Sequence, residues 1–183
     1  MDAWAFHPVI AAVRNMDGAR EAAALSGRRA VFLLGGDIQT LPDYIMLLRG
    51  AGKTVFVHLD LVEGIGRDAS GVRYLAANGV SGLISTRTPL VKAARQEGMI
   101  AVQRMFLIDS DSLESGVHML GASHADCCEV MPGLVPKAIT SLKGRIPQPI
   151  IAGGMITEGE EVEVALRAGA VAVSTSNRAL WDL

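Results

Sequence analysis

Short apolar runs and helical patterns alternate eight times along the 183 residues, and this alternation limits the possible fold more than any other feature. In the second helical pattern, for example, Ile38, Leu41, Ile45 and Leu48 share one face. Continuous apolar strands that alternate with amphipathic helices predict a parallel sheet covered by helices. The apolar runs are residues 9–13, 30–34, 54–59, 82–85, 99–106, 125–131, 149–152 and 170–174.

Eight strand–helix units predict an α/β fold, a small TIM-type (β/α)8 barrel formed by residues 1–183 as a single domain. The fold usually takes ~250 residues, so we expect minimal loops, a truncated barrel or one missing helix. The loop at residues 60–68 and the short last helix are where we expect the departure. A doubly wound open sheet is the alternative, but no G-x-G-x-x-G motif follows the first apolar run.

Composition and charge bear on the cellular setting. The formal net charge is −2, so no overall basic field indicates nucleic acid or an anionic membrane. Cys127 and Cys128 are too few and too close for a disulfide framework and indicate a reducing compartment. Residues 1–4 lack the basic segment of a signal peptide, and no apolar stretch approaches ~18 residues. We therefore expect a cytoplasmic protein without a membrane partner.

Glycines and hydroxyl residues follow the last two apolar runs, where Gly153 and Gly154 end one run and Ser174, Thr175 and Ser176 end the other. Glycine lets the backbone approach a ligand closely, and a helix N-terminus attracts anions. Two such ends side by side resemble the phosphate site after the seventh and eighth strands of a (β/α)8 barrel. These five residues are therefore predicted to bind a phosphate group. The alternative is that the glycines only form a tight turn.

Charged side chains lie near the ends of other runs: His58, Asp60, Glu63, Arg104 and Glu129. Polar residues at the C-terminal ends of barrel strands face the site, so we expect them to form a polar mouth around a ligand. With strand alternation, His58 and Asp60 would share a face. Structural alternatives stay open. The histidine could bond a backbone carbonyl, the Asp60 and Glu63 carboxylates could bind loop N–H groups, and Arg104 with Glu129 could be a structural ion pair.

The positions of the lysines bear on catalysis. None of Lys53, Lys92, Lys137 and Lys143 lies at the C-terminal end of a predicted strand, so Schiff-base aldolase chemistry is disfavoured. Asp60 with Glu129 could perform acid–base chemistry on a small phosphorylated metabolite, so a barrel enzyme is the alternative function. We nevertheless assign no catalytic residue, because no nucleophile stands out. We also expect no metal, because no nearby ligand set completes a site with the cysteines.

Several strings together resemble the glycerol uptake operon antiterminator regulatory proteins. They occur in the family's order and cover nearly the whole chain. The strings at Val55–Gly64 and Gln103–Ser110 are more particular to the family than the glycine and serine strings, which many phosphate-binding barrels share. The others are Pro8–Val13, Glu129–Gly133, Ile151–Ile156, Ser174–Ser176 and Leu180–Trp181.

The resemblance implies a bacterial regulator, not an enzyme, that responds to glycerol 3-phosphate and binds leader mRNA of glycerol-utilisation operons to prevent early termination. It implies this effector and no other cofactor. RNA binding needs clustered basic residues, and Arg67, Arg73 and Arg87 are the candidates, with Arg104 expected nearby. No RNA-recognition motif with stacking aromatic residues is present in the sequence. RNA as a partner therefore rests on the resemblance, and assembly into a homo-oligomer is left open.

Overall fold

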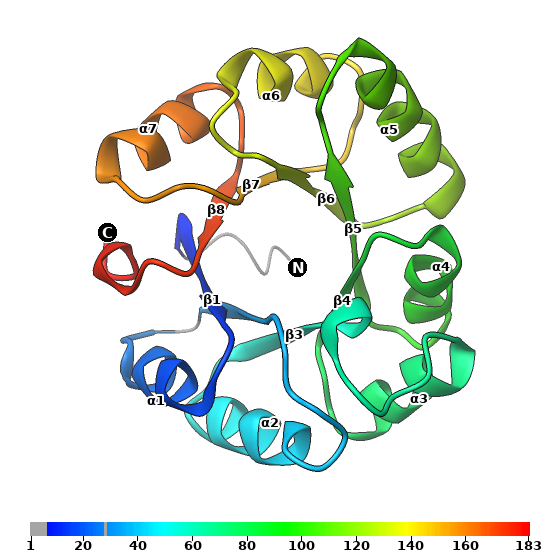
Figure 1. Ribbon diagram of the computed structural model, residues 1–183, viewed down its shortest axis with the longest axis vertical. Helices are drawn as coiled ribbons and strands as arrows, with labels where there is room; N and C mark the ends of the chain where they lie inside the picture. Colours follow the sequence, from blue (N-terminus) through cyan, green and yellow to red (C-terminus); the bar gives the residue numbers. More distant parts are fainter. Residues whose placement is uncertain (1–6, 28) are drawn as a thin grey trace.

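The computed structural model describes residues 7–27 and 29–183, which form one closed barrel of eight parallel strands. The residues on which the signal-peptide expectation rests, 1–4, lie outside this range. The strands pair in sequence order, and β8 closes the barrel against β1 (Figure 1). The prediction of a TIM-type (β/α)8 barrel is therefore confirmed, and the open doubly wound sheet is excluded.

The elements follow the predicted alternation. The strands are β1 (Val9–Val13), β2 (Ala30–Leu33), β3 (Thr54–His58), β4 (Gly82–Ser85), β5 (Ile100–Phe106), β6 (Cys127–Met131), β7 (Ile150–Gly153) and β8 (Ala172–Thr175). The α-helices are α1 (Met16–Ala24), α2 (Leu41–Gly50), α3 (Ala69–Ala77), α4 (Thr88–Gln96), α5 (Ser110–Ser123), α6 (Pro136–Lys143) and α7 (Gly159–Arg167). Two 3₁₀ turns complete the set, η1 (Leu59–Leu61) and η2 (Arg178–Leu180).

Two apolar layers hold the barrel together, because successive side chains of each strand point to opposite faces. Inward residues such as Ile10, Phe32 and Ile84 fill the barrel, while a larger cluster packs the outer faces of the strands against the helices. Phe32 and Phe56 meet inside, with ring centroids 5.3 Å apart. Gly82 leaves the space for Phe56, since a Cβ there would lie 2.2 Å from the ring.

The eighth helix is replaced by the short turn η2, which lies between α7 and α1 in the outer ring (Figure 1). Trp181 follows this turn and is buried, and its indole Nε1 donates to the carbonyl of Thr175 at 2.9 Å. Arg29 donates to the carbonyl of Trp181. One aromatic residue thus seals a gap that a whole helix usually covers, which confirms the expected missing helix.

Two predicted helix caps are shifted along the chain. The sequence pattern predicts a capping box at Asp111 and Glu114, but the box that forms pairs Asp109 with Ser112. Glu114 instead binds Arg145, at 2.5 Å between Oε1 and Nη1. The sequence pattern also predicts a capping box at Thr157 and Glu160, but it is the Glu161 carboxylate that accepts the N–H groups of Thr157 and Glu158, just before α7.

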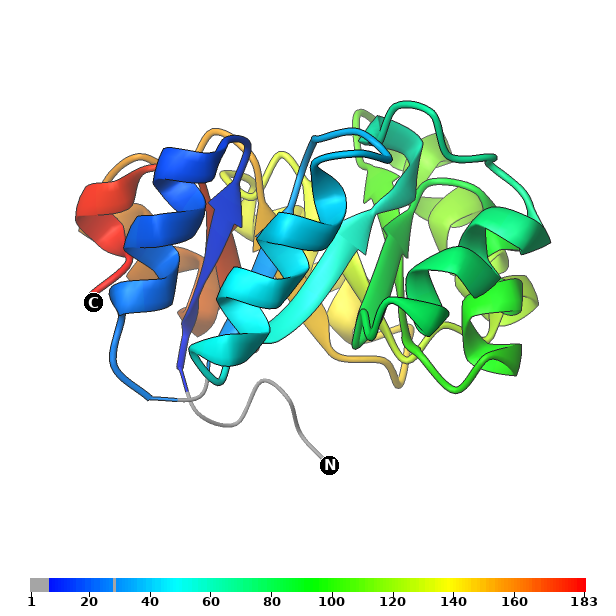
Figure 2. The same cartoon turned by 90° about the horizontal axis from the view of Figure 1, so that it is seen from below.

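All strand arrows point to the same edge of the barrel (Figure 2), so the loops that follow the strands gather at one end. These loops carry the polar residues singled out in the sequence. Within the part of the chain that the structure describes, no helix is long and apolar enough to cross a membrane.

Candidate ligand-binding site

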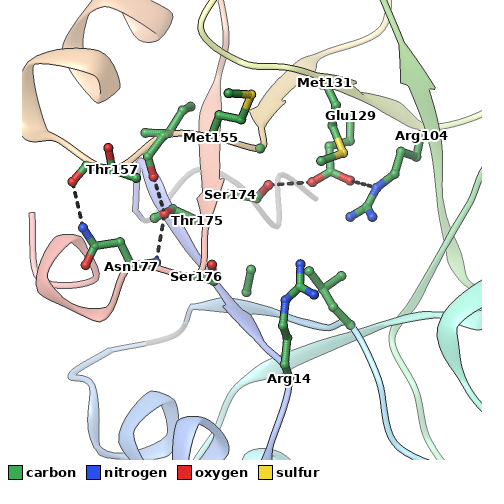
Figure 3. Close-up of a pocket in the computed structure, with 14 residues that line it drawn as sticks. Arg14, Arg104, Glu129, Met131, Met155, Thr157, Ser174, Thr175, Ser176 and Asn177 are labelled. Atoms are coloured by element: carbon green, nitrogen blue, oxygen red, sulfur yellow. Dashed lines mark hydrogen bonds and ion pairs between the residues drawn. The ribbon is translucent and has the colours of Figure 1, made fainter.

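A pocket of about 250 Å³ opens at this end of the barrel (Figure 3). Its lining comes from the C-terminal halves of β1, β5, β6 and β8, from Leu34 just after β2 and from the loop after β7. The volume lies below the ~300–1,000 Å³ usual for drug-sized ligands. Four of the five predicted phosphate residues line it: Gly154, Ser174, Thr175 and Ser176. Arg104 and Glu129 of the predicted polar mouth line it too.

A row of three polar side chains forms one wall of this pocket. Arg104 Nε donates to Oε2 of Glu129 at 2.6 Å, and the Ser174 hydroxyl donates to Oε1 at 2.5 Å. Glu129 is 1% exposed and Arg104 is 6% exposed. The two residues lie opposite each other on β5 and β6, which fixes the pair. We call Arg104, Glu129 and Ser174 the polar row.

Gly153 does not line the pocket but lies directly against the polar row. A Cβ at this position would lie 2.6 Å from the Ser174 hydroxyl and 2.7 Å from Glu129 Oε1. A side chain of any kind would displace both groups. The glycine therefore makes room for the polar row, which is a different role from the predicted contact with phosphate.

The next two residues, Gly154 and Met155, turn the chain at the rim. Both have left-handed backbone, with φ of 77° and 64°. A Cβ on Gly154 would also lie 2.6 Å from the Met131 methyl group. Both the positive φ and the lack of space therefore favour glycine at this position. The turn leaves the Met155 side chain 71% exposed above the pocket.

The loops after β7 and β8 are tied together through Thr175 and Asn177. The Thr175 hydroxyl donates to the carbonyl of Ile156 at 2.8 Å and accepts the N–H of Asn177 at 3.0 Å. The Asn177 amide donates to the carbonyl of Thr157 at 2.7 Å. Thr175 thus holds the site together, whereas the Ser176 hydroxyl makes no hydrogen bond within residues 7–27 and 29–183 and stays available to a ligand.

Arg14 is the residue that the sequence reasoning missed. It directly follows β1 and lines the pocket, with its side chain pointing inward across from the polar row (Figure 3). Among the described residues its guanidinium has no ion-pair or hydrogen-bond partner. With Arg14 and Arg104 against Glu129, the charged lining residues sum to +1, which favours an anion. The signal available in the sequence was the position of Arg14 at the C-terminal end of a predicted strand.

His58 and Asp60 lie outside this pocket. The predicted strand alternation stops at His58, because the chain enters η1 and Asp60 turns toward β4. There the Asp60 carboxylate accepts the hydroxyl of Ser85 at 2.8 Å and the N–H of Thr86 at 2.9 Å. The two side chains still lie together as expected, although Asp60 belongs to η1 and not to the strand. Asp60 does not share the pocket with Glu129.

His58 is buried, and its Nδ1 lies 3.7 Å from the Asp60 carboxylate without a hydrogen-bond partner in the described chain. Burial lowers the pKa of His58 to about 4; the nearby Arg104 charge acts in the same direction, and Asp60 opposes it. The ring is consequently neutral at pH 7, so the contact with Asp60 is not an ion pair there. The alternative that His58 bonds a neighbouring backbone carbonyl remains compatible with this position.

Glu63 belongs to a neighbouring loop contact. Its backbone pairs with the loop after β2, through bonds to Gly36 and Ile38. The Glu63 side chain is exposed and does not line the pocket. Its role as a ligand contact therefore stays a prediction that the pocket geometry does not favour.

The arginines proposed for RNA contact are distributed differently from the expectation. Arg104 is buried in the polar row and does not join the others. Arg87 is half-exposed and lies 3.4 Å from Asp60 through Nε, while Arg73 donates to Ser70 on α3. Arg67 is exposed just before α3. The remaining three thus lie around the loops that follow β3 and β4.

The groups that would indicate enzyme chemistry lie elsewhere. No lysine lines the pocket, and Lys53 donates to the carbonyl of Gly27 at the opposite end of the barrel. Cys127 and Cys128 are buried, and burial raises the pKa of both thiols, so neither is a ready nucleophile. Within the described residues, no group of three His, Cys, Asp or Glu side chains could hold a metal ion.

Comparison with known proteins adds evidence that is independent of the pocket geometry. The model of the glycerol-3-phosphate responsive antiterminator family matches residues 9–181. The chain is 35% identical over 178 residues to the uncharacterized protein YgcP of Escherichia coli K12, covering 97% of this chain and 93% of that protein.

Comparison with solved structures supports the same family. A glycerol uptake operon antiterminator regulatory protein from Listeria monocytogenes is 31% identical with a TM-score of 0.92, over 97% of this chain and 96% of that one. A related protein from Thermotoga maritima is 33% identical with a TM-score of 0.86, over 97% and 99%. Deoxyribose phosphate aldolase from Aeropyrum pernix, 17% identical with a TM-score of 0.68 over 95% and 87%, shares the fold alone.

Proposed function

Because this chain belongs to the glycerol-3-phosphate responsive antiterminator family, we propose that its pocket binds glycerol 3-phosphate and that occupancy controls binding to leader mRNA of glycerol-utilisation operons. The match confirms the resemblance seen in the sequence strings. The family is one of regulatory proteins, so the prediction of a regulator rather than an enzyme is confirmed at the family level.

The observation that carries the proposal is the Arg14 guanidinium, which has no partner among the described residues and faces a small pocket. Arginine binds phosphate with two parallel hydrogen bonds. In our proposal Arg14, the Ser176 hydroxyl and the backbone at Gly154 hold the phosphate, while the polar row meets the glycerol carbons. Thr175 supports these loops from behind.

For the RNA, we propose the loops after β3 and β4, where Arg67, Arg73 and Arg87 lie. A local basic patch can neutralise phosphates even though the formal net charge is −2. A regulator of transcripts acts where they are made, so we propose a cytoplasmic location.

Effector-dependent RNA binding can be measured by gel mobility shift with leader RNA from the host's glycerol-utilisation messages. We expect millimolar glycerol 3-phosphate to change the apparent Kd at least about fivefold, the lower end of usual coupling energies. The triple variant Arg67→Gln/Arg73→Gln/Arg87→Gln should weaken binding and flatten its salt dependence. An Arg20→Gln/Arg167→Gln variant, altered on α1 and α7, is the matched control. Equal RNA affinity with and without effector would contradict the proposal.

A further inference from the structure

We propose that the polar row recognises a hydroxyl group of the ligand. The ligand is a phosphate monoester in which the carbon next to the ester carbon carries a hydroxyl group, and esters with a ketone or a carboxylate at that carbon are rejected. This inference rests on the proposed function, since it assumes that the pocket holds a small phosphate ester. It adds which oxidation level of the carbon skeleton the protein responds to.

The hydrogen bonds that Glu129 already accepts determine how many further donors its carboxylate can bind. Each carboxylate oxygen has one donor in the structure, Arg104 Nε on Oε2 and the Ser174 hydroxyl on Oε1. A carboxylate offers about four acceptor positions, so Glu129 keeps acceptor capacity, and it lines the pocket. Arg104 has further N–H groups of its five donors, and it lines the same pocket.

Together Glu129 and Arg104 present an acceptor and a donor next to each other. A hydroxyl group matches both, because it donates its proton to the carboxylate and accepts from the guanidinium. A ketone oxygen only accepts, so it would leave the buried carboxylate facing another oxygen without a proton between them. A ligand carboxylate would add repulsion between like charges.

Glu129 has little freedom to avoid that conflict. It is 1% exposed and held from two sides by Arg104 and Ser174. The Gly153 backbone packs close behind it, since a Cβ at this position would lie 2.7 Å from Oε1. A fixed polar group that loses its partner is costly, which is how such sites reject a close analogue.

The test is a calorimetric titration of the wild-type protein with three small phosphate monoesters. On the carbon next to the ester carbon, glycerol 3-phosphate carries a hydroxyl group and dihydroxyacetone phosphate carries a ketone, whereas in phosphoglycolate this carbon is the carboxylate itself. A hydrogen bond to a charged group is worth about 1.5–3 kcal/mol, so we expect the ketone to bind roughly 10–100-fold more weakly and the carboxylate at least as weakly. Equal binding of all three would overturn the inference and leave the effector proposal standing, whereas no binding by any would remove both.

A Glu129→Gln variant separates the role of this carboxylate from general shape. Its amide can donate to a ketone, so the preference for glycerol 3-phosphate over dihydroxyacetone phosphate should fall about tenfold or more. Glu163→Gln, an exposed change on α7, is the control and should keep the wild-type ratio. An unchanged ratio in Glu129→Gln would contradict the assignment. The wild-type panel does not depend on the variant's folding.

Discussion

The Glu129→Leu variant is expected to lose about 3–5 kcal/mol of unfolding free energy, because removing one partner of a buried ion pair leaves the other charge uncompensated. Arg104 is 6% exposed and has Glu129 as its ion-pair partner, so the variant strands a guanidinium in the barrel mouth. Urea denaturation at pH 7 measures the change through the shift of the midpoint at constant slope.

The double variant Arg104→Met/Glu129→Leu is the informative control. Replacing a buried ion pair by apolar residues of similar volume is often neutral or stabilising. We therefore expect the double variant to regain most of the lost stability and yet to lose ligand binding, since it removes both groups that would meet the glycerol. A single variant as stable as wild type would show that the pair is not buried in the way described.

The second large effect concerns His58. Because burial lowers its pKa to about 4, the unfolded chain binds a proton between pH 6.5 and 4 that the folded protein does not bind. The contribution of His58 to the unfolding free energy is therefore fully present above pH 6.5. It falls by about 3 kcal/mol in total as the pH drops from 6.5 to about 4. Urea denaturation at several pH values between 7.5 and 5 measures the upper part of this decline, about 2 kcal/mol.

Carboxylates also titrate at the acid end of this range, so the comparison is with a His58→Gln variant. That variant has no titrating ring, and its stability should change much less between pH 7 and 5. His118→Gln, a change on α5 outside the buried mouth, should keep the wild-type slope. Parallel curves for wild type and His58→Gln would contradict a buried neutral histidine.

The barrel itself could be predicted from the sequence, because it depends on patterns that are local. Each strand is a nearly continuous apolar run and each helix has its own stripe, so the alternation is visible without long-range information. Even the missing helix was anticipated, because the last helical pattern, with Leu180 and Trp181, is short. What the sequence could not show is that Trp181 fills the gap, because this depends on the packing of β8 against β1.

The candidate site was predicted in part. The glycines and hydroxyls after β7 and β8 carry a local signal, and four of the five line one pocket. His58 and Asp60 lie together as expected, but outside this pocket, because the chain enters η1 and the Asp60 carboxylate binds groups at the end of β4. Arg14 was overlooked because a single arginine after a strand has no motif around it. Only closure of the barrel brings β1 beside β8 and makes that arginine part of the pocket.

The separate roles of the glycines and hydroxyl residues could also be assigned only from the structure. Gly153 and Thr175 support the polar row and the loop contact, while Gly154 and Ser176 line the pocket with groups that a ligand could reach. Sequence spacing treats these residues alike. Their roles separate through contacts between residues that are far apart in the sequence, such as Ser174 and Glu129.

Titration calorimetry of glycerol 3-phosphate into the wild-type protein, Arg14→Gln and Arg20→Gln tests the central claim most directly. The account predicts one ligand per chain for wild type and for Arg20→Gln, and binding at least about tenfold weaker for Arg14→Gln, because a charge-assisted bond to the phosphate is lost. No binding to wild type at millimolar ligand, or equal binding by Arg14→Gln, would contradict it.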